Sequence, residues 1–277
     1  MPVKKEANGR RSIQVEVEVP GTPEQVWQAI ATGPGISAWF VPTEMIEPGP
    51  DGKPTKMKME FAPGMESAAS ITAYDAPRRL AAEDSWGPDS PVIATEWTVE
   101  ARSGGTCLVR VVHSLFAETD DWDNQLEGVE NGWPGFFRIL KNYLANFRGQ
   151  RSASIQAMGM GGSSVAEVWS KLLSGLNLSD AREGQRVRAT VNGASISGVV
   201  GTVVPIHKAL KHEEATLQVH LDEPVPGVLA LGANNCMGGP MATIYFYLYG
   251  NNADSVVKRD AEKWQGWMAE KFPMPQM

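Results

Sequence analysis

Residues 13–27 read IQVEVEVPGTPEQVW, and this stretch predicts a strand that passes directly into a helix. Apolar and polar side chains alternate from Ile13 to Val19, which is the pattern of a strand with one buried face. Thr22 and Gln25 have the spacing of a capping box, in which the hydroxyl accepts from a backbone N–H and the glutamine bonds back to the cap. We therefore expect a helix from about Thr22 to Ala31.

A similar beginning recurs in the second half of the chain, which indicates one domain plan used twice. Ile155-Gln156 is followed by a second capping box at Ser164 and Glu167. Each half also closes on a long amphipathic helix with apolar residues at helical spacing. These residues are Trp133, Phe136, Phe137, Leu140, Leu144 and Phe147 in the first half, and Val257, Ala261, Trp264, Trp267, Met268 and Phe272 in the second. The pattern predicts two domains, residues 1–150 and 151–277, with chance similarity of two amphipathic helices as the alternative.

Charge and composition argue against several classes of function. The formal net charge is −7 and the isoelectric point is near 5.2, whereas nucleic acid binding needs a basic face. The basic cluster between Lys4 and Arg11 is expected to be a solvated tail, because an alternating strand follows it instead of the apolar run of a secretory signal. No stretch has the roughly 18 apolar residues of a spanning helix. We expect a cytoplasmic protein without a membrane span and without a nucleic acid partner.

The chain has two cysteines, Cys107 and Cys236, one in each expected domain. Neither stands in a CxxC or comparable spacing. We expect both to be buried apolar side chains rather than parts of a disulfide or a metal site.

After its first helix, the first half predicts an antiparallel sheet. A hairpin is expected from Ile93 to Phe116, with its turn at Ser103-Gly104-Gly105. Its inward side chains should be Ile93, Thr95, Trp97 and Val99 on one strand and Val109, Val111, His113 and Leu115 on the other. The acidic segment from Glu118 to Asn131 is expected to lead into the closing helix. The order of elements predicts an α+β fold in which a sheet wraps one long helix and encloses a cavity if side chains do not fill it.

Six motifs in the first half together resemble a known family. They are Thr-Pro-Glu-Gln-Val-Trp at 22–27, Gly-Ile-Ser-Ala-Trp-Phe at 35–40, Ala-Pro-Arg-Arg-Leu at 76–80, Gly-Gly-Thr-Cys-Leu-Val at 104–109, His-Ser-Leu-Phe at 113–116 and Gly-Trp at 132–133. As an ordered set over about residues 13–149, they resemble the heat-shock-protein-90 ATPase activator-like (AHSA-like) branch of the START-like (SRPBCC) helix-grip superfamily. The resemblance implies a helix-grip fold and a connection to the stress response. It implies a function only loosely, because one fold hosts lipid carriers, cyclases, hydrolases and chaperone activators.

The second half predicts a divergent copy of the same fold. A helix is expected from Ser164 to about Leu173, strands near 186–191, 197–204, 214–221, 227–231 and 241–249, and a final helix from Asp254. The glycines within Met158-Gly159-Met160-Gly161-Gly162 predict either a weakened first strand or a flexible connector. The Trp-Phe and Gly-Trp motifs are absent here, so no functional residue is carried over to this half.

The sequence offers few residues for catalysis. No GxSxG elbow, P-loop or dinucleotide fingerprint occurs, and His212-Glu213-Glu214 is interpreted as a solvated turn rather than a metal site. We expect no metal, no cofactor and no catalytic constellation. His113 is the one candidate acid or base, and its place on an apolar strand face near Trp97 favours a hydrogen-bonded core residue.

Large, soft apolar side chains are abundant instead, with nine Trp and 12 Met. Several stand where a helix grip faces its cavity, and flexible methionines with flat aromatic rings suit an adaptable ligand pocket as well as an ordinary core. The candidate pocket residues are Trp39, Phe40, Met57, Met59, Phe61, Trp86, Trp97, His113, Trp133, Phe136, Phe137 and Leu140. Asn131 is a further polar candidate at the mouth, whereas Glu60 and Arg110 should point outward.

Three functions remain open at this point. The preferred hypothesis is binding or carriage of a small hydrophobic molecule in the first helix grip. The second is a chaperone-associated module that binds another protein, although the eukaryotic activators engage their partner through a separate N-terminal domain that these motifs do not include. The third is a cavity enzyme that uses His113 as its acid or base.

Overall fold

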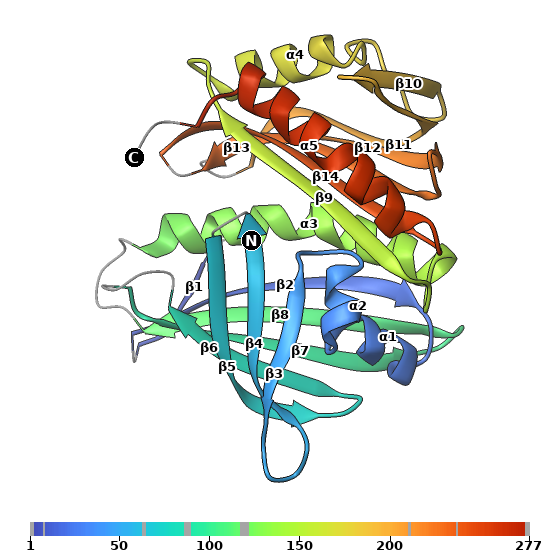
Figure 1. Cartoon of the computed structure of the whole chain (residues 1–277). Helices are drawn as coiled ribbons and strands as arrows, with labels where there is room; N and C mark the ends of the chain where they lie inside the picture. Colours follow the sequence, from blue (N-terminus) through green and yellow to red (C-terminus); the bar gives the residue numbers. More distant parts are fainter. Residues whose placement is uncertain are drawn as a thin grey trace. The chain divides into compact units, whose positions relative to one another are not determined.

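A computed structural model of the chain describes residues 3–7, 9–62, 65–85, 90–116, 122–209, 212–236 and 238–274 (Figure 1). It divides the chain into two compact units, Met1–Gly149 and Gln150–Met277. No helix within the described ranges is both long and apolar enough to cross a membrane.

The first unit is an antiparallel sheet crossed by one long helix. Its elements are β1 (Lys4–Lys5), β2 (Arg10–Pro20), α1 (Pro23–Ile30), α2 (Gly33–Ser37), β3 (Thr43–Pro48), β4 (Pro54–Ala62), β5 (Met65–Asp75), β6 (Arg79–Ser85), β7 (Val92–Arg102), β8 (Thr106–Phe116) and α3 (Asp123–Asn146). The eight strands are ordered β1-β2-β8-β7-β6-β5-β4-β3, so the opening strand β2 pairs with the last strand β8.

The second unit repeats this order of elements with fewer strands. It contains β9 (Ser152–Met160), α4 (Val165–Gly175), β10 (Arg186–Val191), β11 (Ala194–Ala209), β12 (His212–Glu223), β13 (Gly227–Cys236), β14 (Gly239–Tyr249) and α5 (Ala253–Lys271). Its six-stranded sheet is ordered β10-β11-β12-β13-β14-β9, so the opening strand again pairs with the last one. Both helices contribute to one apolar core with the sheet, for example Leu172 from α4 and Trp264 from α5. Antiparallel sheets with a long C-terminal helix confirm the predicted α+β helix-grip class.

Local sequence explains how the first unit begins. In α1 the Thr22 hydroxyl accepts from the Gln25 N–H, and the Gln25 side chain accepts from the Thr22 N–H, so both halves of the predicted capping box form. The expected alternation on the β7–β8 hairpin also holds. Of its eight predicted inward residues, seven are buried and Thr95 is half-buried.

The structure corrects one expectation about the elements and decides between two alternatives for another. The lead-in to the closing helix is itself helical, because α3 begins at Asp123, well before Trp133. Its glycines and Pro134 hide the helical pattern in the sequence. Within the glycine-rich stretch at 158–162, the residues up to Met160 belong to a strand and not to a connector, because β9 pairs with β14 along its whole length.

Cys236 also differs from the expectation, because it is exposed at the end of β13 whereas Cys107 is buried. Cys107 lies on the inward side of β8, where its Sγ contacts the carbonyl oxygen of Gly21 at 3.3 Å. Burial raises the pKa of the Cys107 thiol. Cys107 is therefore the small apolar core residue that we expected, and Cys236 is not.

Candidate functional site

Trp133 of α3 lies at the centre of an aromatic cluster in the first unit. Its ring centroid lies 5.0 Å from that of Trp97 on β7 and 5.4 Å from that of Phe137 one helical turn further along α3. Phe40 stacks on Trp133 at 5.2 Å. Trp39 completes this group at 6.0 Å from Trp97. These separations are those of rings in direct contact, so the tryptophans of three distant segments form one packed group.

Trp39 is held in place by the two short helices before it. The Thr32 hydroxyl caps α2 by accepting from the Gly35 N–H at 3.1 Å. Gly35 allows α1 and α2 to approach closely, because a Cβ there would lie 1.8 Å from the carbonyl oxygen of Gln28. The indole N–H of Trp39 then donates to the carbonyl oxygen of Ala29 at 2.9 Å. Trp39 is 1% exposed, so its ring is a fixed wall of the cluster.

The cluster reaches the surface through four half-buried side chains, Phe40, Met59, Phe61 and Phe136. Phe40 connects them, with its ring 4.7 Å from Phe136 and 6.1 Å from Phe61. Phe40 and Met59 also pack against a second apolar group that contains the buried Met57. We call Phe40, Met59, Phe61 and Phe136 the rim. The rim leaves part of its apolar surface in water, where it can meet an apolar ligand.

The structure thus brings together most of the predicted pocket residues. Trp39, Phe40, Phe61, Trp97, His113, Trp133, Phe136 and Phe137 are linked by ring contacts, and Met57 and Met59 join them through Phe40. Leu140 is fully buried. Trp86 lies outside the described residues.

One polar group, His113 of β8, lies beneath the cluster. Its Nε2 lies 2.9 Å from the indole nitrogen of Trp133, and its Nδ1 lies 2.9 Å from the hydroxyl of Thr95. Burial lowers the pKa of His113 to about 4. A neutral ring with both nitrogens engaged positions Trp133, and this is the hydrogen-bonded core role that the sequence favoured over an acid or base. Thr95 was predicted to point inward but was not recognised as a partner of His113.

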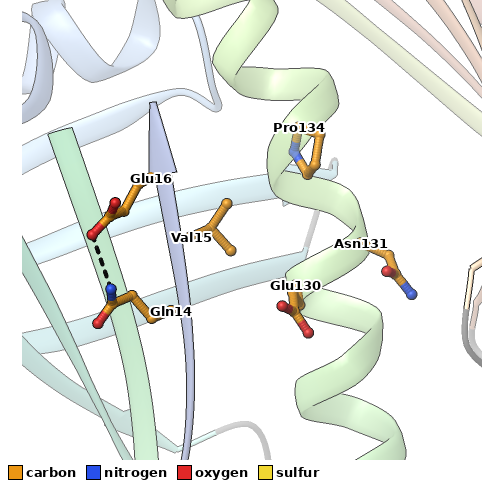
Figure 2. A pocket seen from close by; sticks show the side chains of 6 residues that line it. All are labelled: Gln14, Val15, Glu16, Glu130, Asn131 and Pro134. Atoms are coloured by element: carbon orange, nitrogen blue, oxygen red, sulfur yellow. Dashed lines mark hydrogen bonds between the residues drawn. The ribbon is translucent and has the colours of Figure 1, made fainter. Parts of the chain in front are cut away.

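A hollow of about 400 Å³ lies between β2 and α3 (Figure 2). It is lined by Gln14, Val15, Glu16, Glu130, Asn131 and Pro134. Of these, the sequence singled out Asn131 alone. Arg110, which we expected to point outward, forms an ion pair with Glu16 at 2.6 Å on the outer face. The hollow could not be foreseen, because it depends on how α3 crosses the edge of the sheet.

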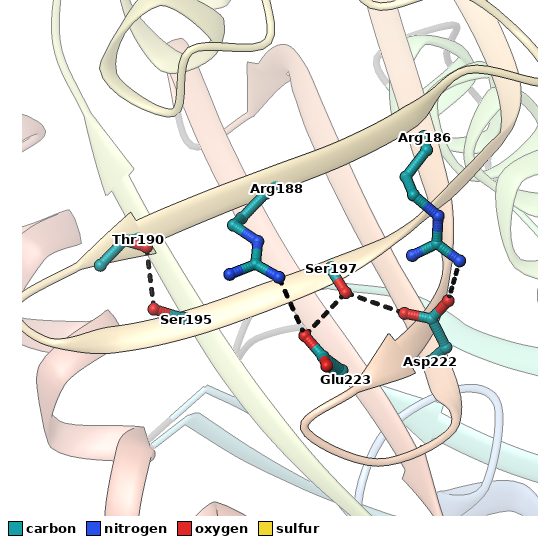
Figure 3. A network of polar contacts seen from close by, with 7 residues as sticks. All are labelled: Arg186, Arg188, Thr190, Ser195, Ser197, Asp222 and Glu223. Carbon is teal, nitrogen blue, oxygen red and sulfur yellow. Dashed lines mark hydrogen bonds and ion pairs between the residues drawn. The ribbon is translucent and has the colours of Figure 1, made fainter.

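The second unit carries a polar network on β10, β11 and β12 (Figure 3). The Ser197 hydroxyl lies within hydrogen-bond distance of both Asp222 and Glu223, at 2.9 and 3.0 Å. Arg186 donates to Asp222 at 2.5 Å and lowers the pKa of that carboxyl group. Because these charges are paired with one another, the network supports the strand pairing and does not form a separate site. Among the residues that the structure describes, no group of three or more His, Cys, Asp or Glu is placed to hold a metal ion.

The fold and the cluster define a helix-grip domain with an aromatic interior, and the comparison with protein families agrees. Residues 20–145 match the family described as activator of Hsp90 ATPase homolog 1-like protein. This match confirms the resemblance seen in the motifs, and the first unit is therefore an AHSA-like helix-grip domain. None of the curated proteins matches the chain.

Three solved structures illustrate what the chain is similar to. The di-domain ARO/CYC BexL from the BE-7585A biosynthetic pathway is 14% identical, with 96% of this chain and 100% of that chain covered and a TM-score of 0.46. DynU16, a putative protein in the dynemicin biosynthetic locus, is 15% identical, with 93% and 96% covered and a TM-score of 0.41. The Aha1 dimer from Colwellia psychrerythraea is 20% identical, with 50% of this chain and 98% of that chain covered and a TM-score of 0.40.

Proposed function

We propose that the first unit binds a small hydrophobic molecule at the aromatic cluster around Trp133. The observation that carries this proposal is the rim. Phe40, Met59, Phe61 and Phe136 come from three separate parts of the chain, the segment after α2, the strand β4 and the helix α3, and all four stay half-buried beside a buried aromatic wall. An apolar ligand placed against them would remove this surface from water, at roughly 25 cal/mol per Å² of apolar area.

The rings are in contact with one another, so a ligand bound among them would separate them. Trp39 and Trp97 are fixed by burial, whereas the rim side chains have solvent on one side. Methionine and phenylalanine can change rotamer without breaking a hydrogen bond. Ring-to-ring contacts are then replaced by ring-to-ligand contacts, which suits a flat or flexible apolar molecule without charged groups at its buried end.

The experiment measures tryptophan emission and thermal unfolding while anilinonaphthalene sulfonate or dodecanoic acid is added. Binding should change the emission, because Trp39, Trp97 and Trp133 share one cluster. It should also raise the melting temperature, since a ligand that binds only the folded state stabilises it by about 2.7 kcal/mol at 100 times its Kd.

A matched pair of variants separates the cluster from the rest of the surface. Met59→Lys places a charge in the rim and should abolish binding, because an unpaired charge is costly against apolar walls. Met65→Lys changes an exposed methionine, 39% accessible, outside the cluster and should bind normally. Absence of both signals across the probes, or equal loss in the two variants, would overturn the proposal.

The family match favours a second candidate, a module that stimulates the ATPase of a heat-shock-protein-90 chaperone. The experiment adds the purified chain to such a chaperone and measures ATP hydrolysis. A stimulation that Met59→Lys leaves unchanged would support the protein-interaction function, and no stimulation would leave ligand binding as the better explanation.

A further inference from the structure

The first half of α3 is built from poor helix formers. Gly128, Gly132, Pro134 and Gly135 all fall within residues 128–135, and Pro134 lies inside the helix. Glycine and proline are the least favourable residues in a helix interior. Because proline has no N–H, the helical hydrogen bond from position 134 to the carbonyl oxygen of position 130 cannot form. The rest of α3, from Phe136 to Asn146, has neither residue type.

Packing does not require glycine at positions 132 and 135. A Cβ placed on Gly132 or Gly135 would meet no atom within 4 Å. The contrast is Gly35, where a Cβ would lie 1.8 Å from a backbone oxygen. Alanine would therefore fit at 132 and 135 and would favour the helix. Glycine at both positions lowers the local stability of α3 without a gain in contact.

Residues 128–135 also border open space. Glu130, Asn131 and Pro134 form one side of the hollow of about 400 Å³, and Gln14 to Glu16 of β2 form the other (Figure 2). The short strand β1 lies next to β2 and, in the described part of the chain, pairs only with Arg11 and Ser12 of β2. Residues 14–16 are therefore at an open edge of the sheet within the described part of the chain, and the α3 segment has room to move beside them.

The centre of the aromatic cluster lies on this same segment. Trp133 stands between Gly132 and Pro134, and it contacts Phe40, Trp97 and Phe137. The indole of Trp133 is fixed by its hydrogen bond to His113 at 2.9 Å. A local loss of helix at 128–135 would withdraw Trp133 from the cluster and connect the cluster with the hollow.

We propose that residues 128–135 are a gate segment and that the hollow between β2 and α3 is the port through which the ligand reaches the cluster. The inference rests on the proposed binding function. In the closed state the His113–Trp133 hydrogen bond holds the gate segment. In the open state the helix unwinds locally, and the ligand passes Glu130 and Pro134.

The first test uses the double variant Gly132→Ala/Gly135→Ala in the full chain, with anilinonaphthalene sulfonate in stopped flow. Alanine disfavours unwinding, so association and dissociation should both slow by roughly tenfold while the Kd stays within about twofold. The matched control is Gly266→Ala in α5, where a Cβ also meets no atom within 4 Å. Unchanged rates in the double variant, or an equal slowing in the control, would overturn the gate.

The second test needs no ligand. Hydrogen exchange should be at least tenfold faster at the amides of residues 128–135 than at those of 139–146, and the double variant should reduce this difference. Equal protection of the two halves of α3 would refute the gate even if ligands bind. If no probe binds while the exchange difference is present, the binding function fails and the mobile segment stands as a separate result.

Discussion

The indole N–H of Trp133 donates to Nε2 of His113 across 2.9 Å, and this contact determines where His113 carries its proton. An indole nitrogen is only a donor, so Nε2 must be an acceptor. The ring proton is therefore on Nδ1, which donates to the Thr95 hydroxyl at 2.9 Å. The neutral tautomer is the form that burial favours, and it joins α3 to the sheet beneath the aromatic cluster.

Stability should fall in mild acid because of His113. Its pKa is about 4 in the folded protein and near 6.5 in the unfolded chain, so between these values only the unfolded state takes up the proton. The contribution of neutral His113 to the free energy of unfolding is complete above pH 6.5. It is lost as the pH falls toward 4, and the total loss is about 3 kcal/mol. Urea unfolding from pH 7.5 to pH 4.5 measures this slope.

His113→Gln provides the comparison for that slope. Glutamine can accept from Trp133 and donate to Thr95 but has no proton to gain in this range. The wild-type protein should lose about 2 kcal/mol more than the variant between pH 7.5 and 4.5. Parallel pH profiles would show that His113 does not titrate with a lowered pKa.

Phe137→Ala should destabilise the first unit by about 3–5 kcal/mol. Phe137 is 3% exposed, and its ring contacts Trp97 and Trp133, so its removal leaves a cavity that fixed neighbours cannot fill. Phe116→Ala is the control, because Phe116 is 64% exposed at the end of β8 and should change stability by less than about 0.5 kcal/mol. Chemical unfolding followed by tryptophan emission gives both values, and a similar small loss in the two variants would mean that Phe137 borders open space.

The sequence predicted those parts of the fold that depend on local patterns. Alternation on β7 and β8 placed His113 and Trp97 correctly on the inward face, because each side chain's direction follows from a period of two. The capping patterns located the starts of α1 and α4 for a similar reason, since they involve only residues within one turn. Only the first forms the predicted box in full, because at α4 the Glu167 carboxylate accepts from the Ser163 N–H and not from the Ser164 N–H. Several candidate pocket residues lie together because they are inward members of such patterns, and their role as a ligand pocket stays a prediction.

Features that depend on contacts between distant segments could not be predicted. Cys236 was expected to be buried because it has no partner cysteine at a disulfide or metal-site spacing, yet it lies at the exposed end of β13. Gly159 obscured the strand β9 in the sequence. A glycine fits there because the end of α5, more than a hundred positions away in the chain, approaches the backbone at position 159. The hydrogen bond between His113 and Trp133 likewise joins residues whose facing geometry is fixed only when α3 crosses the sheet.

A buried ion pair at the start of α3 should contribute strongly to the first unit. Arg11 of β2 and Asp123 are paired at 2.7 Å, with side chains 9% and 12% exposed, and Lys5 also reaches Asp123 at 2.6 Å. Asp123→Asn would leave the Arg11 guanidinium buried beside a neutral amide, and we expect a loss of about 3 kcal/mol. Urea unfolding at neutral pH measures it.

The control for that pair is Glu100→Gln. It breaks the contact between Glu100 and Arg102, whose side chains are 56% and 45% exposed, and it should cost less than about 1 kcal/mol. Added salt should change the loss of stability in Glu100→Gln more than the loss in Asp123→Asn, because solvent ions screen exposed charges. Equal losses in the two variants would mean that Arg11 finds other partners once Asp123 is neutral.

Gly159→Ala should destabilise the second unit by about 2–3 kcal/mol, although alanine suits a strand no worse than glycine does. A Cβ at position 159 would lie 2.0 Å from the carbonyl oxygen of Phe272 and 2.7 Å from its Cβ. Phe272 cannot withdraw easily, because it is 1% exposed and its ring contacts Trp267. Either β9 or the end of α5 must therefore shift.

Urea unfolding of Gly159→Ala beside Gly266→Ala measures this strain within one domain. Position 266 lies within α5 with no atom near its added Cβ, so alanine there should be neutral or stabilise the helix by up to about 1 kcal/mol. The emission of Trp267 should also change in the first variant and not in the second, since the displaced Phe272 ring is its neighbour. If Gly159→Ala is as stable as the wild type, the close approach between β9 and the end of α5 is not a constraint on the fold, and the glycine at 159 needs another explanation.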